Sequence, residues 1–438
     1  MNEVGKLSSP DNELIYLIAT SREPVSRNDL ARLTGLSKMT ISRHVAALVE
    51  RGILTETTER ISEQSMGRIP ASLSLSASFP CICGILIKRS YVQTVLTDLS
   101  GKIIDMAKHY NEPDMNAEKL KRLLRKQYDE VTKGAKRHIL GCGIAAIGPL
   151  DSNTGRILKP ADFYGISDFP VVEIMREHTG LPVYLLHDAS AGALAEKIYG
   201  NGMNYDNYIY LHIAEGIGLG FIQNGQLFCE MYGRSGEIGH TSINFNGPKC
   251  SCGNNGCLEV YASVQRMREK IQELLPYSSD SQFRRIKNPS WENIVELADS
   301  GDMIATIALD EFCTYLAYAI GNVLNLINFS IIVIGYDSKK SSDVVTRMLQ
   351  AKMKNFHSAA ERGVKVISAY FDNSPLMGAA AVVANEVFQQ NSLFCHEKKK
   401  IPLDYLVTKN SKNDTNDSRK RMTYGRSEPK TRQNIQKI

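Results

Sequence analysis

The stretch Gly236–Glu259, GEIGHTSINFNGPKCSCGNNGCLE, places one histidine and three cysteines close together in mid-chain. His240, Cys250, Cys252 and Cys257 span eighteen residues. Three thiolates and one imidazole fill a tetrahedral zinc shell and leave no open position for water. Simple packing would explain one buried cysteine, but four potential ligands at this spacing favour a metal. The stretch therefore predicts a closed, structural Zn²⁺ site.

The composition is that of an ordinary soluble protein. The chain has 438 residues, of which 43% are hydrophobic and 23% charged, so two or three domains are expected. No uninterrupted apolar run approaches the ~18 residues of a membrane span, and the start MNEVGKLSSPDNE lacks a signal-peptide core. Nine cysteines, an odd number, favour reduced thiols. These features predict a cytoplasmic protein with no membrane partner.

The basic balance belongs to the C-terminal tail, residues 393–438. From Glu397 onward, twelve lysines and arginines stand against five acidic residues. The tail thus carries +7, which leaves −2 of the net +5 for the remainder. We expect this polar segment to be disordered. It could add non-specific attraction to nucleic acid, although a merely solvated terminus is the favoured alternative.

Residues 1–78 carry the pattern of a winged helix-turn-helix. An apolar helical face begins at Leu14, and a second helix follows Ser26 as its N-cap. Gly35 supplies the turn into a third helix, which is capped by Ser37 and has apolar residues at i, i+4 and i+7. RGILTE and the segment ERISEQSMGRIPASLSL after it predict a two-stranded wing.

The outward face of the third helix predicts contacts with double-stranded DNA. Its hydroxyls and cations suit base edges and phosphates in the major groove, and an arginine at or near the tip of the wing suits a narrow minor groove. A plain three-helix module with a solvated face is the alternative, supported by the near-zero charge of this domain. The candidate DNA-binding residues are Ser37, Lys38, Thr40, Ser42, Arg43 and Arg68, with His44 as a further member of the face.

From Cys81 onward the pattern changes to an α/β chain. Strand-like runs such as CICGILI and YVQTVLTD precede a long amphipathic helix around residues 116–137. Strands and helices alternate again up to the small-residue helix SPLMGAAAVVANEVF. The order predicts two repeats of a strand meander followed by helices.

Over residues 12–392 the chain resembles the ROK family (repressors, open reading frames and sugar kinases) of the actin-like ATPase superfamily. The family's signature is Gly-His, nine residues, then Cys-x-Cys-Gly-x-x-Gly-Cys-Leu-Glu, and it is matched from Gly239 to Glu259. The fused winged helix makes the repressor branch, with xylose-type and N-acetylglucosamine-type regulators, the better match. The resemblance implies a two-lobed actin-like body over residues 79–392, with a zinc loop at 240–257.

The resemblance also implies a sugar site beside the zinc loop. The family's residues that face the sugar correspond to Glu237, His240 and Glu259, and Asp188 holds the place of the catalytic base. Asp188 could equally be a simple hydroxyl acceptor or a helix N-cap. The predicted sugar-binding residues are His187, Asp188, Glu237, His240 and Glu259, where His187 replaces an asparagine of the family.

The nucleotide side departs from the family in three places. The first phosphate loop, Gly-x-Asp-x-Gly-Gly-Thr, reads GILIKRS from Gly84 to Ser90 and has lost its acid and two glycines. The second, Gly-Thr-Gly-Ile-Gly, reads AEGIG, and the carboxylate of Glu215 would repel phosphate by roughly 4 kcal/mol at ~4 Å. Tyr336 stands where kinases keep a second glycine near adenosine. We therefore expect no catalysis, with Asp188 as a vestigial base.

These features predict a sugar-responsive DNA-binding regulator, a repressor of carbohydrate-utilisation genes. One winged helix contacts few base pairs, so a homodimer or a dimer of dimers on operator DNA is expected. A sugar that closes the two lobes would release the DNA. Two alternatives remain open: an active ATP-dependent sugar kinase with a DNA-binding domain, and a scaffold that binds DNA without any effector.

Overall fold

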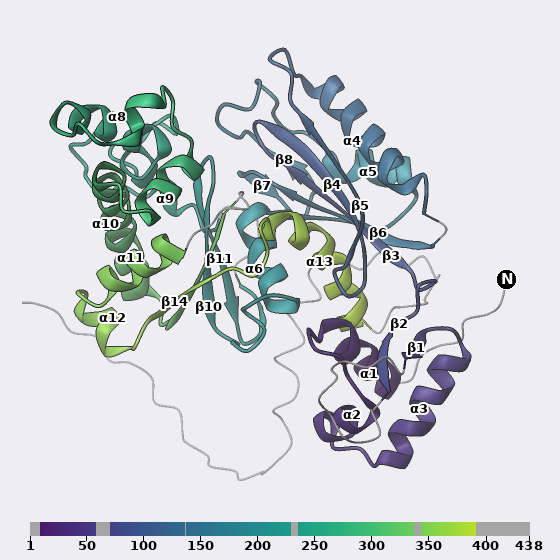
Figure 1. Cartoon of the computed structure of the whole chain (residues 1–438). Coiled ribbons are helices and arrows are strands. Elements are labelled where there is room, and N and C mark those ends of the chain that lie inside the picture. The colour runs from purple at the N-terminus through teal and green to yellow at the C-terminus, as the bar shows by residue number, and fades with distance from the viewer. Residues whose placement is uncertain (1–8, 58–70, 136, 229–234, 337–342, 391–438) are drawn as a thin grey trace, which may run out of the picture. The chain divides into compact units, whose positions relative to one another are not determined.

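The computed structural model of the chain describes residues 9–57, 71–135, 137–228, 235–336 and 343–390. The N-terminal part is a winged helix-turn-helix, as predicted (Figure 1). Its elements are α1 (Ser9–Thr20), α2 (Arg27–Thr34), α3 (Lys38–Glu50), β1 (Leu54–Thr57) and β2 (Ser72–Leu75).

Local signals explain the bounds of these helices. The Ser26 side chain accepts the N–H of Asp29, and the Asp29 side chain accepts the N–H of Ser26, so a capping box starts α2. Gly35 ends α2 in the left-handed region at φ 71°. Ser37 then caps α3 by accepting the N–H of Thr40. Because β1 and β2 pair antiparallel, the two strands of the expected wing are confirmed, whereas its tip lies outside the described residues.

The body begins with a five-stranded sheet in the order β5-β4-β3-β6-β9. Helix α4 packs on β4 and β5, and α5 packs on β9. A two-stranded hairpin, β7 and β8, follows β6. The elements of this lobe are β3 (Cys81–Ile87), β4 (Tyr91–Asp98), β5 (Ile103–Tyr110), α4 (Ala117–Thr132), β6 (Ile139–Ala146), β7 (Leu150–Asp151), β8 (Arg156–Ile157), α5 (Val171–Thr179), β9 (Val183–His187) and α6 (Asp188–Ile198).

A second five-stranded sheet has the order β12-β11-β10-β13-β14. Its strands are β10 (Tyr208–Ile213), β11 (Ile217–Gln223), β12 (Gln226–Leu227), β13 (Ile331–Tyr336) and β14 (Lys365–Ser368). The helices of this half are η1 (Ile238–His240), α7 (Leu258–Tyr261), α8 (Val264–Leu274), η2 (Leu275–Tyr277), η3 (Gln282–Arg285), α9 (Trp291–Asp299), α10 (Met303–Leu326), α11 (Asp343–Met353) and α12 (His357–Glu361). The last described helix, α13 (Ser374–Gln390), returns to the first sheet and packs on β3 and β6.

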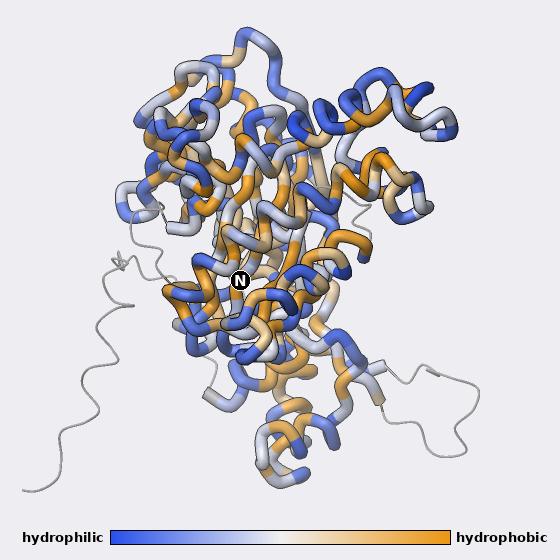
Figure 2. Tube along the Cα trace, turned by 90° about the vertical axis from the view of Figure 1, so that its left-hand side faces the viewer, coloured by the Kyte–Doolittle hydropathy of each residue, from blue (hydrophilic) through white to orange (hydrophobic). Residues whose placement is uncertain are grey.

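The two sheets share one topology, which confirms the predicted repeat. In each sheet the first three strands form an antiparallel meander, a fourth strand pairs parallel with the first, and a fifth pairs parallel with the fourth. Both faces of β10 are buried, with Leu211 packed among the outer helices and Tyr210 packed against Ala193 of α6. Figure 2 shows the apolar and polar segments that alternate along the described helices.

Helices α6 and α13 pack against each other, α6 mainly on β10 and β11 of the second sheet and α13 on β3 and β6 of the first (Figure 1). Small residues make this close packing possible. A Cβ at Gly143 of β6 would lie 1.8 Å from the carbonyl oxygen of Ala379, and one at Gly378 would lie 1.9 Å from that of Ala191. The run of glycine and alanine in α13 therefore lets the two helices and the sheet approach backbone to backbone.

The winged helix shares a hydrophobic core with α6 and α13. Leu14 and Ile15 of α1 belong to the same buried cluster as Ile198 of α6 and Val387 of α13. The link between α1 and α2 adds polar contacts through one side chain, Arg22. Its Nε donates to the Tyr199 carbonyl at 3.1 Å, its Nη1 donates to Asn201 at 3.0 Å, and its guanidinium lies 4.0 Å from the ring centroid of Tyr370.

Helix α10 bears on the expectation that the chain has no segment able to span a membrane. Among the described residues it is the one helix long and apolar enough, by length and composition alone, to span a membrane. Phe312, Leu316 and Ile320 recur along its buried face, within the core of the second lobe. This periodicity is that of a core helix in a globular lobe.

Candidate functional site

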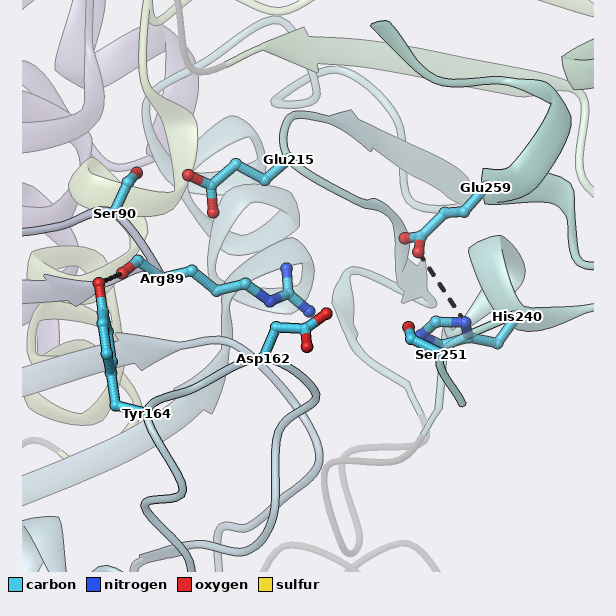
Figure 3. A pocket seen from close by; sticks show the side chains of 8 residues that line it. All are labelled: Arg89, Ser90, Asp162, Tyr164, Glu215, His240, Ser251 and Glu259. Atoms are coloured by element: carbon cyan, nitrogen blue, oxygen red, sulfur yellow. Dashed lines mark hydrogen bonds and ion pairs between the residues drawn. The ribbon is translucent and has the colours of Figure 1, made fainter. Parts of the chain in front are cut away.

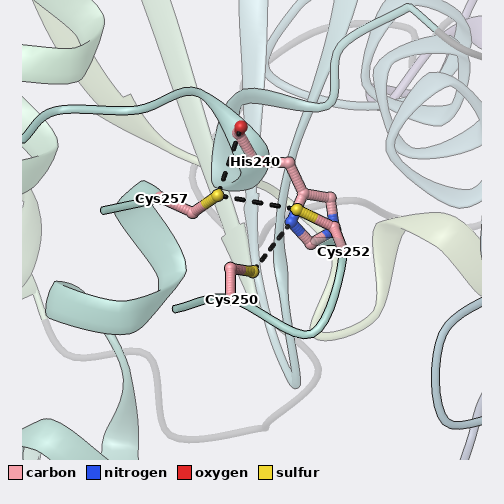
Figure 4. Close-up of side chains that lie close together, drawn as sticks. All are labelled: His240, Cys250, Cys252 and Cys257. Atoms are coloured by element: carbon pink, nitrogen blue, oxygen red, sulfur yellow. Dashed lines mark hydrogen bonds between the residues drawn. The ribbon is translucent and has the colours of Figure 1, made fainter. Parts of the chain in front are cut away.

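The predicted metal ligands lie together in one loop. One ligand atom from each of His240, Cys250, Cys252 and Cys257 lies within 4.8 Å of the others (Figure 4). His240 Nδ1 is 3.6 Å from Cys250 Sγ, and Cys252 Sγ is 3.6 Å from Cys257 Sγ. Among the residues that the structure describes, this is the one such group of histidine, cysteine and acidic side chains.

The loop backbone holds these side chains in place. The N–H of Cys250 donates to the Asn254 carbonyl at 2.8 Å, and Gly253 has φ 94°. At Gly256 a Cβ would lie 1.7 Å from the Asn244 carbonyl oxygen, so only glycine fits there. The turns therefore bring the four ligand atoms together through main-chain contacts.

The chemistry of the donors fits a metal ion. The backbone N–H of Asn254 lowers the pKa of the Cys252 thiol, whereas burial and the neighbouring thiols raise the pKa of Cys257 to about 12. Three thiols this close cannot all ionise without a cation between them. A dication would supply that charge, and three sulfurs with one imidazole nitrogen make a closed tetrahedral set.

A cavity of about 400 Å³ lies next to this loop. Side chains from both lobes reach it (Figure 3). Arg89 and Ser90 follow β3, Glu215 lies between β10 and β11, and the metal loop with the start of α7 contributes the rest of one wall. The lining residues are Arg89, Ser90, Asp162, Tyr164, Glu215, His240, Ser251 and Glu259.

Glu259 is held at the wall of this cavity by tight packing. Its Oε1 accepts the N–H of Ile217 at 2.9 Å, and its Oε2 lies 3.9 Å from His240 Nδ1. A Cβ at Gly216 or at Gly239 would approach Glu259 Oε1 to 2.5 or 2.6 Å. Gly216, one of the two glycines that remain in the second phosphate loop, thus leaves the space that the Glu259 carboxylate occupies.

The other predicted sugar residues form a polar chain behind the cavity wall. His187 and Asp188 are only 4% and 7% exposed, and neither lines the cavity, unlike His240 and Glu259. His187 Nδ1 lies 3.4 Å from Asp188 Oδ1, and His187 Nε2 lies 3.5 Å from Glu237 Oε1. The chain therefore leads from the start of α6 to the residue just before η1.

Lys88 is the residue of this region that sequence reasoning missed. Its Nζ donates to Asp188 Oδ2 at 2.7 Å and lies 2.9 Å from His212 Nε2, and the residue is 2% exposed. Burial alone would raise the pKa of the Asp188 carboxyl, but the Lys88 ammonium, with His187 and His212, holds it well below its usual range. The signal was a lysine directly after the seven apolar residues of β3.

The predicted DNA-binding residues differ in their exposure and in their contacts within the domain. Lys38 and Arg43 are exposed on α3, whereas the Ser37 and Thr40 hydroxyls lie 2.9 Å apart at its N-cap. The prediction that His44 belongs to the outward face of α3 was wrong, because its Nδ1 lies 2.8 Å from Asp11 Oδ1 and its side chain is largely buried. Arg68 lies outside the described residues. The prediction also omitted an apolar residue of this face, since Met39 is 86% exposed.

A winged helix joined to a repeated, two-lobed α/β body defines the class: a DNA-binding module on a sugar-kinase-like fold. The chain belongs to the ROK family, whose model matches residues 82–386, and a MarR family model matches residues 9–60. Its fold and family thus agree with the expectation from the sequence.

Curated relatives match the chain along almost its whole described length. The xylose repressor of Bacillus subtilis (strain 168) is 30% identical over 378 residues, which cover 85% of this chain and 94% of that protein. The DNA-binding transcriptional repressor Mlc of Escherichia coli (strain K12) is 26% identical and covers 89% and 96% of the two chains. The dual regulator NagC of the same strain is 25% identical and covers 87% and 94%.

Solved structures agree at the level of the fold. A ROK family transcriptional regulator, a homologue of the E. coli MLC protein, has a TM-score of 0.67 at 24% identity and covers 88% of this chain and 96% of that chain. A ROK family glucokinase from Streptomyces griseus, in complex with glucose and AMPPNP, has a TM-score of 0.62 at 22% identity, with 69% and 98% covered. The body is therefore shared by regulators and kinases.

Proposed function

We propose that this chain is a sugar-responsive transcriptional regulator that represses carbohydrate-utilisation genes. The observation that carries the proposal is the combination, in one chain, of a winged helix with an exposed cationic face and a polar cleft in a ROK body. Relatives that match 85% and 89% of this chain are a xylose repressor and the repressor Mlc. A regulator of this kind acts where its operator is, which agrees with the cytoplasmic location expected from the sequence.

The DNA side rests on the N-terminal half of α3. Lys38, Ser42 and Arg43 are proposed to contact phosphates and base edges, because the N-terminal residues of a recognition helix enter the major groove. Ser37 and Thr40 are assigned a supporting role through the N-cap. Arg68 of the wing stays a prediction for the minor groove. A homodimer or a dimer of dimers would place two such helices about 34–36 Å apart on a pseudo-palindrome.

The effector side rests on the cavity and the polar chain behind it. His187, Asp188, Glu237, His240 and Glu259 are proposed to bind the sugar. Carboxylates accept hydrogen bonds from pairs of hydroxyl groups, which suits a polyol better than an apolar ligand. Zn²⁺ is proposed for the four-ligand set, where it would be structural and would fix His240, whose second ring nitrogen can face the sugar.

We propose that the kinase fold is catalytically silent. Leu86 stands in place of an acid and Glu215 in place of a hydroxyl, and Cβ atoms on the first phosphate loop obstruct the approach of phosphate to the backbone. Asp188 is a poor general base because its carboxylate is paired with Lys88. Tyr336 is buried, with its ring centroid 5.6 Å from that of Trp291, and so contributes bulk to the lobe core.

An active sugar kinase is the second candidate. Asp188 stays at the start of α6, and a kinase with bound glucose and AMPPNP shares the fold. A scaffold that binds DNA without an effector is the third.

One panel separates these candidates. The full chain would be incubated with D-xylose, D-glucose or N-acetyl-D-glucosamine, each with and without Mg-ATP, and its melting temperature and affinity for a duplex selected from a random library would be measured. We expect one sugar alone to raise the melting temperature and weaken DNA binding. Sugar-dependent ADP formation would instead establish the kinase, and DNA binding indifferent to every sugar would establish the scaffold.

A further inference from the structure

The buried ion pair between Lys88 and Asp188 is a feature that neither a silent kinase nor a sugar site by itself requires. The two charged atoms lie 2.7 Å apart, and the two side chains are 3% and 10% exposed. Burying a lysine and an aspartate costs several kcal/mol for each ion, which their attraction offsets only when the geometry is good. Stability alone is therefore a weak reason for the pair.

The position of Lys88 ties it to the cleft. The next two residues, Arg89 and Ser90, line the cavity, while Lys88 itself turns inward from the end of β3. The polar chain that starts at Lys88 continues through Asp188 and His187 to Glu237, just before the metal loop. Lys88 thus lies at the inner end of the proposed sugar residues.

Without Lys88 the carboxyl of Asp188 would be protonated more readily. The charged and titratable groups around it are Lys88 at the end of β3, His187 at the end of β9 and His212 in β10. Removal of the Lys88 ammonium would take away the positive charge that lies 2.7 Å from this carboxyl, and burial favours the protonated form. A protonated carboxyl donates a hydrogen bond and loses part of its capacity to accept one.

The Asp188 carboxylate keeps lone pairs that its contacts within the protein do not use. Oδ2 accepts from Lys88, and Oδ1 accepts the N–H of Ala189 at 2.7 Å. An ionised carboxylate offers about four lone-pair sites, so hydroxyl hydrogens of a polyol can be added to these two contacts. The pairing with Lys88 is therefore compatible with sugar binding.

We propose that Lys88 is a positioning residue of the effector site, which holds Asp188 as a fixed, ionised acceptor for a sugar hydroxyl. A lysine of the chain itself supplies the positive charge beside this carboxylate, so we expect sugar binding to require neither nucleotide nor magnesium. This inference rests on the proposed function, in that it requires the cleft to bind a sugar.

Lys88→Met tests the inference by isothermal titration calorimetry of the full chain, from about pH 5.5 to about pH 8.5, with the panel sugar that binds the wild type and no nucleotide. The variant should bind more weakly at low pH and recover as the pH rises, by up to about tenfold per unit below the new pKa of Asp188. The wild type should not show this dependence. Lys126→Met, an exposed lysine of α4 in the same lobe, is the matched control and should follow the wild type.

A double variant, Lys88→Met with Asp188→Asn, covers the case in which the single variant does not fold. It removes both buried charges at nearly constant shape, so it should fold, bind sugar about tenfold more weakly than the wild type and show no extra pH dependence. Wild-type affinity in the double variant, or a wild-type profile in Lys88→Met, would overturn the inference while the regulator stands. Failure of every panel sugar to bind the wild type would overturn the proposed function, and the role of Lys88 with it.

Discussion

The two sides of the cleft differ in how their charged and ionisable side chains are arranged. On the metal-loop side, four potential ligand atoms lie within 4.8 Å of one another. Glu259 lies at the cavity wall, packed closely against Gly216 and Gly239. On the side of the two altered phosphate loops, Lys88 of the first loop is buried against Asp188, and Glu215 of the second loop lines the cavity where the family has a hydroxyl. The first side gathers four potential metal ligands beside the cavity, whereas the second pairs its buried charges and adds an acidic side chain to the cavity. Under the proposed function, this difference would let the cleft recognise a sugar while it disfavours a nucleotide.

The largest expected effect lies on the metal side. Cys252→Ser should strip the ion and reduce sugar binding below detection, because structural zinc contributes on the order of 10 kcal/mol to its own loop. Metal content by mass spectrometry and sugar binding by calorimetry would measure the two losses. Lys249→Ala, an exposed non-ligand of the same loop, should keep both. Purified wild type with no stoichiometric metal would contradict the metal site.

A pair of substitutions in different parts of the chain should separate effector binding from DNA binding. Glu259→Ala should weaken sugar binding by about 10–100-fold, since hydrogen bonds to a charged group contribute about 1.5–3 kcal/mol, while DNA binding stays. Arg43→Ala should weaken DNA binding with sugar affinity intact. A sugar titration of the protein–DNA complex measures both. If the Glu259 variant responds as the wild type does, the effector site lies elsewhere.

A smaller effect is expected at the contact that joins the cleft to the winged helix. Arg22 contacts Tyr199 and Asn201, just beyond the end of the helix that Asp188 begins, and lies over Tyr370. Arg22→Ala should leave both separate affinities near their wild-type values but reduce the factor by which sugar changes DNA affinity about fivefold, or about 1 kcal/mol of coupling. Arg32→Ala, which removes only an exposed ion pair with Asp29, is the control. An unchanged coupling factor would exclude this route.

The smallest effect is expected at the second phosphate loop, where restoring one family residue should not restore sugar phosphorylation. Glu215→Thr restores the hydroxyl of the second phosphate loop, yet Leu86 and the lost glycines still prevent phosphate binding. A coupled assay should detect no sugar-dependent ADP formation from the wild type or from this variant. Turnover by the wild type that Asp188→Asn abolishes would instead show that both sides of the cleft serve a kinase.

Several features of the site followed from the sequence because they are local. The metal ligands are confined to one loop, and the caps Ser26 and Ser37 act on residues three positions away, so connectivity alone brings them together. Strand and helix order likewise predicted the repeated α/β body, since apolar periodicity reports which faces are buried. The exposed face of α3 differs from the prediction at two residues: Met39 lies on it, whereas a carboxylate 33 residues earlier in the chain holds the His44 ring largely buried.

What the sequence alone determined about this protein is the set of its parts: a winged helix, a two-lobed body, a loop with four potential metal ligands and two loops that depart from the family's phosphate-binding pattern. The tertiary structure decided how distant residues combine. Lys88 meets Asp188 across 100 residues and His212 across 124, because the ends of β3, β9 and β10 converge where α6 begins. It also decided that Glu259 lines the cavity while Asp188 is buried behind it. Contacts of this kind depend on strand order and helix packing, which the spacing of residues along the chain does not reveal. The balance of charge in a buried site depends in turn on these contacts.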